Sequence, residues 1–163
     1  MRNNKPVTPE AARIRMADLC ARSEQCEGDI RQKLYKMGLT SAQISEVINF
    51  LKDSRFIDNA RFARSFSRDK CRFSGWGKYK IQTALAAKRL SSQDISEGLK
   101  AIEPSDYHDA LRRTALAKAR TLDLFGEEAK ENRLKLFRHI LSRGFESNLA
   151  SEMVKEIIRS HNS

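Results

Sequence analysis

The sequence carries one pattern three times, and an internal repeat of about fifty residues restricts a chain to a tandem architecture. Three apolar positions recur after 51 residues and again after a further 55: Ile30, Leu34, Leu39; Ile81, Leu85, Leu90; Leu136, Ile140, Phe145. A unit of about fifty residues buries little apolar surface alone, so each copy gains by packing on its neighbours. The repeat therefore predicts three similar units in a row.

Each copy predicts three helices, because its apolar residues follow helical spacing and no segment alternates with the period of two that marks a strand. The expected helices cover residues 9–21, a segment opened by Ser23 and ending at 37, a segment opened by Thr40, and then 58–73, 78–88, 92–102, 107–124, 127–143 and 147–160. Thr8 followed by Pro9 is typical of a helix start.

These helices predict an all-α fold: three tandem three-helix units forming an elongated, curved helical-repeat chain. Pro104 and Ser105 mark the last boundary, so we expect units at 8–57, 58–105 and 106–160, after a disordered N-terminus at 1–7. Gly38 and Gly144 hold matching places in the repeat, where a helix ends on a residue with positive φ. The second copy has Arg89 there instead.

Basic residues outnumber acidic ones, with 31 Lys+Arg against 21 Asp+Glu and a net charge of +10. Such an excess predicts a polyanionic partner: nucleic acid, an acidic protein or a membrane surface. Within residues 61–89, nine Lys and Arg residues accompany one acidic residue, Asp69. Ordinary solvated helices interleave both signs, so this segment predicts a surface that follows phosphates.

The helix at 58–73 separates arginine from phenylalanine. On a helical wheel its four arginines fall within an arc of about 80°, and Phe62, Phe66 and Phe73 within a separate arc of about 40°. The rings are therefore expected to face a core and the arginines to face outward. The residues predicted to bind a polyanion are Arg61, Arg64, Arg68, Arg72, Lys78, Lys80 and Arg89. A merely solvated basic face is the alternative interpretation.

Gly75, Trp76 and Gly77 join the helices at 58–73 and 78–88, around the only tryptophan of the chain. Backbone N–H groups and an indole ring at a tight turn make this a possible contact loop. Equally, the glycines serve the geometry of the turn and Trp76 pins the bundle. The spacing is not that of a nucleotide-binding loop.

Nothing in the sequence predicts an enzyme, a cofactor or a metal. No histidine lies near a serine or cysteine in a recognisable constellation, and Cys20, Cys26 and Cys71 form no CxxC pair. An odd number of cysteines predicts reduced thiols in a cytoplasmic protein. No apolar run is long enough to span a bilayer, and the first residues lack the apolar stretch of a signal peptide. We expect a monomer with no membrane partner.

Four segments resemble the RecX family, bacterial regulators of the RecA recombinase. They are SRFIDNARFA (54–63), SGWG (74–77), KIQTAL (80–85) and LFRHILSRGF (136–145). They are similar to the family's aspartate-rich turn with its RF/YA helix, its Gly-aromatic-Gly turn, its I-x-x-x-L helix, and its closing helix that ends in arginine, glycine and an aromatic residue. One departure is Lys88-Arg89, where the family usually has Lys-Gly.

The resemblance implies a non-enzymatic inhibitor of RecA that acts in recombination, DNA repair and the SOS response. Such a protein binds the groove of the RecA filament on single-stranded DNA and limits filament extension, ATP hydrolysis and strand exchange. It also implies weak direct contact with single-stranded DNA, to which the basic residues named above would contribute.

Two other functions are compatible with three-helix units. A helix-turn-helix-like DNA-binding regulator reads base edges through one recognition helix, usually as a dimer, and no helix here carries a set of Asn, Gln and Arg placed for bases. A purely structural helical-repeat scaffold leaves the charge imbalance unexplained.

Overall fold

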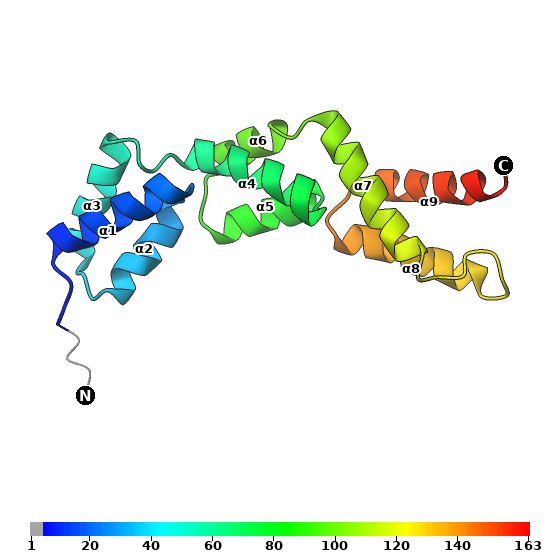
Figure 1. Cartoon of the computed structure of the whole chain (residues 1–163), viewed down its shortest axis with the longest axis horizontal. Coiled ribbons are helices and arrows are strands. Elements are labelled where there is room, and N and C mark those ends of the chain that lie inside the picture. Colours follow the sequence, from blue (N-terminus) through cyan, green and yellow to red (C-terminus); the bar gives the residue numbers. More distant parts are fainter. Residues whose placement is uncertain (1–4) are drawn as a thin grey trace.

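The computed structural model describes residues 5–163, which form nine α-helices and no β-strand (Figure 1). The helices are α1 (Pro9–Arg22), α2 (Glu27–Lys36), α3 (Ser41–Asp53), α4 (Asn59–Ser74), α5 (Lys78–Ala87), α6 (Ser92–Lys100), α7 (Pro104–Ala119), α8 (Ala129–Ser142) and α9 (Ser147–His161). Of the N-terminus predicted to be disordered, residues 1–4 lie outside the described residues, and Val7 packs against the first core.

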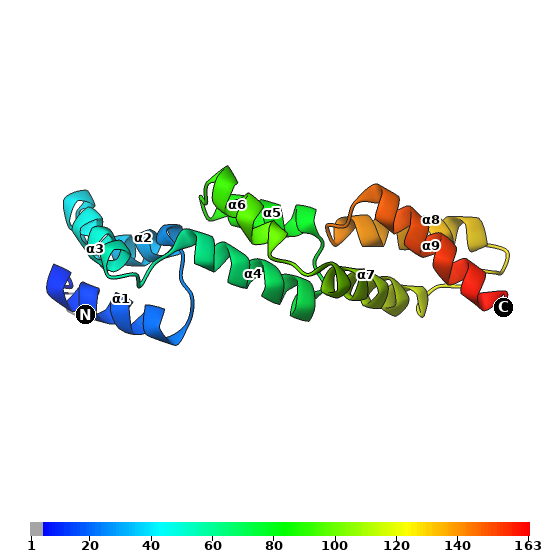
Figure 2. The ribbon, with the colours of Figure 1, turned by 90° about the horizontal axis from the view of Figure 1, so that it is seen from above.

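The helices form three groups in a row, which we call the first unit (α1–α3), the second unit (α4–α6) and the third unit (α7–α9). Figures 1 and 2 show the row from two perpendicular directions, with α1 near one end and α9 near the other. The molecule is narrow in both views, and Figure 1 shows the row arched, with the second unit above the line that joins the two ends. The prediction of an all-α, elongated and curved helical-repeat chain is therefore confirmed.

Four of the nine helices within residues 5–163 begin with a side-chain cap, at Thr8, Thr40, Asp58 and Ser91. The Thr8 hydroxyl accepts the N–H of Ala11 at 3.2 Å, and Thr40 and Gln43 form a capping box. Ser23, predicted to open the second helix, instead closes α1, and the N-cap residue of α2 is Cys26, whose side chain makes no capping bond. Cys26 is fully buried in the core of the second unit, so packing rather than side-chain capping sets the start of α2.

The helix predicted at 107–124 lies earlier in the chain. α7 begins at Pro104, since proline fits the first turn of a helix. It ends at Ala119, and the loop that follows is held by Asp123, whose carboxylate accepts the N–H groups of Phe125 at 3.0 Å and Gly126 at 2.9 Å. These two bonds lower the pKa of Asp123. Such local bonds compete with helix formation, and here they end it.

The three matching turns share one backbone conformation. Gly38, Arg89 and Gly144 have φ values of 85°, 63° and 96°, which confirms the register of the repeat. A left-handed conformation suits glycine, whereas it costs about 1–2 kcal/mol for a residue with a Cβ atom. Arg89 is therefore strained where its two counterparts are not.

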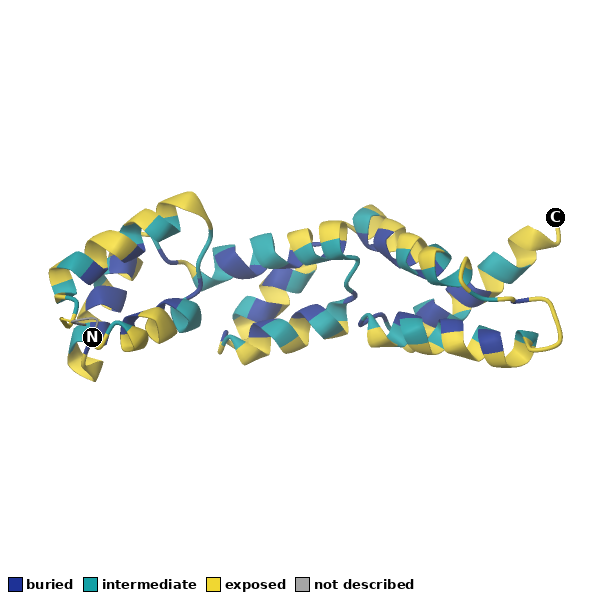
Figure 3. Ribbon diagram, turned by 60° about the horizontal axis from the view of Figure 1, so that its bottom comes forward, coloured by how far each residue is buried: buried dark blue, intermediate teal, exposed yellow. Residues whose placement is uncertain are grey.

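Two hydrophobic cores run through the three units (Figure 3). The first unit has its own core, which includes Ile30, Leu34 and Leu51. The second and third units share one continuous core from Phe62 in α4 to Val154 in α9. The first unit is therefore a separate packing unit, while the second and third are fused.

The closest helix pair within the second unit is α4 and α6. Gly98 of α6 faces Ala63 of α4, and a Cβ atom at Gly98 would lie 2.8 Å from the Cβ of Ala63. Small residues on both helices thus allow this approach. The pair α4 and α6 forms the frame on which α5 packs.

The second and third units meet backbone to backbone. The N–H of Gly77 donates to the Arg143 carbonyl at 2.8 Å, and the N–H of Tyr79 donates to the Gly144 carbonyl at 2.9 Å. The start of α5 is therefore docked on the turn between α8 and α9. A Cβ atom at Gly77 would overlap the backbone of Gly144, so only glycine fits.

Tyr107 of α7 stabilises the same joint by hydrogen bonds at the start of α5. Its phenol accepts the N–H of Lys78 at 3.1 Å and donates to the Glu146 carboxylate at 2.7 Å. Burial and the bond to Glu146 raise the pKa of Tyr107, so the phenol stays neutral and keeps both bonds.

Gly77→Ala should lower the free energy of unfolding by about 3 kcal/mol or more, because the added methyl overlaps a backbone that cannot move aside as a side chain can. Gly38→Ala is the matched control: no atom lies within 4 Å of a Cβ there, so backbone strain alone should remove about 1 kcal/mol. Urea unfolding measures both variants, and equal losses would contradict the docked joint.

Candidate nucleic-acid and protein interface

α4 carries four of the predicted binding residues, and in the structure it links the units on either side of it. Arg61 pairs with Glu24 of the first unit, with 2.6 Å between Nε and Oε1. Another nitrogen of Arg61 donates to the carbonyls of Arg55 and Phe56 at 3.2 and 3.3 Å. Arg61 is thus a tie between the first and second units.

The far end of α4 is tied to the third unit in the same way. Arg72 pairs with Asp106 of α7 at 2.8 Å, and Arg113 of α7 donates to the Arg72 carbonyl at 2.9 Å. Hydrogen bonding to Asp106 raises the pKa of Arg72, so the guanidinium keeps its charge. Arg68 donates to the Ala101 carbonyl at 3.3 Å. Three of the four arginines therefore have partners within the protein.

Arg64 and the three phenylalanines of α4 do not all lie where the helical wheel predicts. Arg64 is half-buried and forms no ion pair within residues 5–163. Phe62 is buried and stacks on Phe66, but Phe73 is 76% exposed, which corrects the expectation that all three rings face a core. The buried face of α4 turns along its length, because its last turns bury Cys71 against α7 instead.

The loop Gly75-Trp76-Gly77 contacts other parts of the same chain. Gly75 ends α4 with a φ of 66°, and the N–H of Gly77 is bonded to the third unit. The Trp76 ring packs on Phe66, with the ammonium groups of Lys70 and Lys80 at 4.7 and 4.8 Å from its centre. Of the two interpretations of this loop, these contacts favour a turn that pins the bundle.

The seven predicted residues do not form one continuous face. Lys78 lies 4.9 Å above the Tyr107 ring and lines a groove between α5 and α6, whereas Lys80 lies on Trp76. Arg61 borders the joint with the first unit, and Arg72 borders the third. Arg89 lies in a different cleft from all of these.

The joint between the first and second units repeats the one between the second and third. The Lys88 carbonyl approaches Gly28 so closely that a Cβ atom at Gly28 would overlap it. The Lys88 ammonium pairs with Asp29 at 2.7 Å, and the Asn59 side chain accepts the N–H of Glu27 at 2.9 Å. The start of α2 is thus docked on the turn between α5 and α6, largely through polar contacts.

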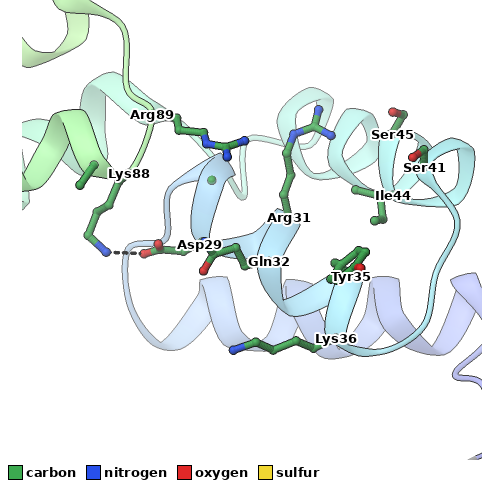
Figure 4. Close-up of a pocket in the computed structure, with 12 residues that line it drawn as sticks. Asp29, Arg31, Gln32, Tyr35, Lys36, Ser41, Ile44, Ser45, Lys88 and Arg89 are labelled. Atoms are coloured by element: carbon green, nitrogen blue, oxygen red, sulfur yellow. Dashed lines mark hydrogen bonds and ion pairs between the residues drawn. The ribbon is translucent and has the colours of Figure 1, made fainter.

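A cleft of about 640 Å³ opens beside this joint (Figure 4). Its charged side chains are four basic residues and one acidic residue: Arg31, Lys36, Lys88, Arg89 and Asp29. Asp29 is neutralised by Lys88, and Figure 4 shows the Arg89 side chain reaching toward the guanidinium of Arg31. Arg31 pairs with Glu27 of its own helix at 3.0 Å, so Lys36 and Arg89 are the basic side chains of the cleft that form no ion pair within residues 5–163.

Sequence reasoning missed the contribution of the first unit to this cleft. Arg31, Tyr35 and Lys36 stand on α2, outside the basic window at 61–89. The spacing of Arg31 and Tyr35 places them on one face of a helix, and Tyr35 is 76% exposed. That signal was present in the sequence, but the docking of α2 on the second unit was not.

The described residues contain no cluster of three or more His, Cys, Asp or Glu side chains that could hold a metal ion. Burial raises the pKa of the Cys26 and Cys71 thiols, which leaves them protonated near neutral pH and slow to react. No helix in this part of the chain is long and apolar enough to cross a membrane.

Comparison with known proteins finds similarity to one family. Residues 58–99 match the family model described as RecX, second three-helix domain. Regulatory protein RecX of Clostridium botulinum (strain Eklund 17B / Type B) is 29% identical over 137 residues, which are 84% of this chain and 64% of that protein. This chain therefore spans a little under two-thirds of that relative.

Other relatives and solved structures match most of the chain. Regulatory protein RecX of Prosthecochloris aestuarii is 25% identical over 83% of this chain and 85% of its own length. A crystal structure of regulatory protein RecX superposes with a TM-score of 0.79, at 23% identity over 91% of this chain and 71% of its own. The crystal structure of RecX from Lactobacillus salivarius superposes with a TM-score of 0.77, at 18% identity. This match covers 91% of this chain and 95% of that one. At these identities the structures show a shared fold.

Arg61→Ala should lower the free energy of unfolding by about 1–3 kcal/mol, because it removes the partner of a carboxylate that is partly withdrawn from water. The other oxygen of Glu24 is buried and has no hydrogen-bond partner within the described residues. Arg64→Ala, one turn along α4, is the control and should change the free energy of unfolding by less than about 0.5 kcal/mol.

The pair can be isolated by adding Glu24→Ala to Arg61→Ala. Urea unfolding should show that the double variant loses less than the sum of the two single losses. Strict additivity would mean that Arg61 does not tie the two units.

Proposed function

The chain belongs to the RecX family, and from this premise we propose that it is a non-enzymatic modulator of the RecA recombinase. It binds in the groove of the RecA filament on single-stranded DNA and limits filament extension, ATP hydrolysis and strand exchange. Its setting is recombination, DNA repair and the SOS response.

The observation that carries the proposal is the extent of the similarity. The match is not confined to the second unit, since curated relatives named regulatory protein RecX align with as much as 93% of this chain. A relative of similar length aligns over 85% of itself. All three units are therefore part of what is shared.

The shape of the molecule supports a partner that is itself a repeating polymer. Three three-helix units follow one another along an elongated body, so one chain can contact several successive subunits. Individually weak contacts then add up, since each later contact forms within an already bound complex. A chain lying along a groove covers the surface that a further subunit or a second DNA strand needs.

The charge supports a filament that exposes nucleic acid. A net charge of +10 favours a polyanionic target, and exposed single ion pairs contribute little, so several must act together. Weak direct binding to single-stranded DNA is part of the proposal. It would add to, and not replace, the contacts with protein.

The test is the ATPase activity of RecA assembled on single-stranded DNA, titrated with this protein. ATP hydrolysis should fall with added protein and level off once the binding sites along the filament are filled, because the effect follows occupancy and not turnover. Unchanged hydrolysis at a twofold molar excess over RecA would contradict the proposal. A helix-turn-helix regulator would give that result and would bind a specific duplex instead.

A small basic protein of similar net charge is the control for this titration. It should not inhibit at the same concentration, because charge alone does not place a chain in the groove. Equal inhibition by the control would show that the effect is sequestration of DNA by positive charge.

A further inference from the structure

We infer that the cleft between the first and second units binds backbone phosphates of single-stranded DNA, with Arg89 as the anchoring side chain. The inference deepens the proposed function by naming the surface that contacts DNA, and it rests on that function only for its setting. Its test uses DNA without RecA, so its failure is distinguishable from failure of the proposed function.

The first reason is the backbone of Arg89. The matching turns end on Gly38 and Gly144, and the second unit keeps an arginine at a φ of 63° where glycine would be free of strain. Residues held in such conformations tend to have side chains that are used. Strain alone does not mark a site, because Arg55 has a φ of 60°, and the two arginines differ in their surroundings.

Those surroundings separate the two arginines. Arg55 also forms no ion pair within residues 5–163, but it lines a pocket of similar volume that contains two acidic side chains, Asp58 and Asp94. In the cleft of Arg89 the only acidic side chain is Asp29, which is paired with Lys88. Within residues 5–163, Arg89 forms no ion pair, so its charge is uncompensated.

The second reason is the way the joint holds Arg89 in place. Gly28 lets the Lys88 carbonyl rest on the start of α2, and the pair between Lys88 and Asp29 fixes the turn against that helix. The next residue, Arg89, is thereby aimed across the cleft toward Arg31 (Figure 4). Arg31 is paired with Glu27 of its own helix at 3.0 Å, whereas Arg89 forms no ion pair within residues 5–163. The planar donors of Arg89 are therefore free to match the oxygens of a phosphate.

The third reason is an exposed aromatic ring beside these cations. Tyr35 lines the cleft and is 76% exposed, and Lys36 follows it on α2. A ring next to a track of positive charge is the arrangement on which an unpaired base stacks while its phosphates are bound. An acidic peptide would use the charges but not the ring, so the combination favours single-stranded nucleic acid.

The experiment measures binding of a fluorescent oligothymidine by anisotropy, as a function of salt concentration. Arg89→Gly should weaken binding at least threefold at low salt and make the slope of log K against log salt less negative by about 0.7, as expected for one lost phosphate contact. The melting temperature should not fall, because glycine relieves the strained φ. Weaker binding by a well-folded variant would therefore be a direct effect.

Arg55→Gly is a matched control, since it removes the same charge from the same backbone conformation outside the cleft. It should leave both the affinity and the salt slope unchanged. Equal losses in the two variants would overturn the site, because they would reflect net charge alone. Unchanged DNA binding by Arg89→Gly would overturn it too, and if RecA inhibition fell at the same time, the cleft would be a protein-binding surface.

A second pair of variants tests the aromatic ring. Tyr35→Ala should weaken oligothymidine binding about fivefold or more through loss of stacking, whereas Tyr35→Phe should retain it. Equal binding by both variants would contradict stacking in the cleft.

Discussion

The close approach of a helix start to the turn of the following unit is the contact on which the tandem structure depends. It occurs twice, with Gly77 against Gly144 and Gly28 against Lys88. At both places a side chain on the first glycine would overlap backbone atoms of the next unit. Each unit can therefore engage its neighbour only where a glycine lies in the first turn of its second helix or just before it. The spacing of the two joints sets the length and the bend of the row.

The fold could be predicted from the sequence because it depends on local and repeating signals. Apolar positions such as Ile30, Ile81 and Leu136 gave the register, and the hydroxyl of Thr8 marked a helix start. The prediction was wrong where a distant contact decided. Ser23 is an adequate cap by chemistry, but burial of Cys26 in another unit moved the start of α2. The Asp123 loop ended α7 early for a reason that helical periodicity does not register.

The basic segment shows why the candidate site was harder to predict. A helical wheel gives the direction of a side chain around one helix but not what lies opposite it. Arg61 and Arg72 point away from their own core, as expected, and meet Glu24 and Asp106 of the two neighbouring units. The excess of positive charge in α4 is therefore partly balanced by acidic residues elsewhere in the chain. Arg89 has no acidic partner within the described residues. It shares a cleft with Arg31, which is 58 residues away in the sequence, so the helical wheel of one segment does not predict this site.

The division of the apolar interior has a mechanical consequence. The second and third units share one core and form a single packing unit. The first unit is held to it by the close contact of Gly28 with the Lys88 carbonyl, by a hydrogen bond from Glu27 to Asn59, by the ion pairs of Lys88 with Asp29 and of Arg61 with Glu24, and by the buried thiol of Cys26. Dissolved ions screen the ionic contacts but not an apolar interior. Salt is therefore expected to weaken the attachment of the first unit more than the fusion of the second and third units, where an ion pair, Arg72 with Asp106, only adds to a shared apolar core.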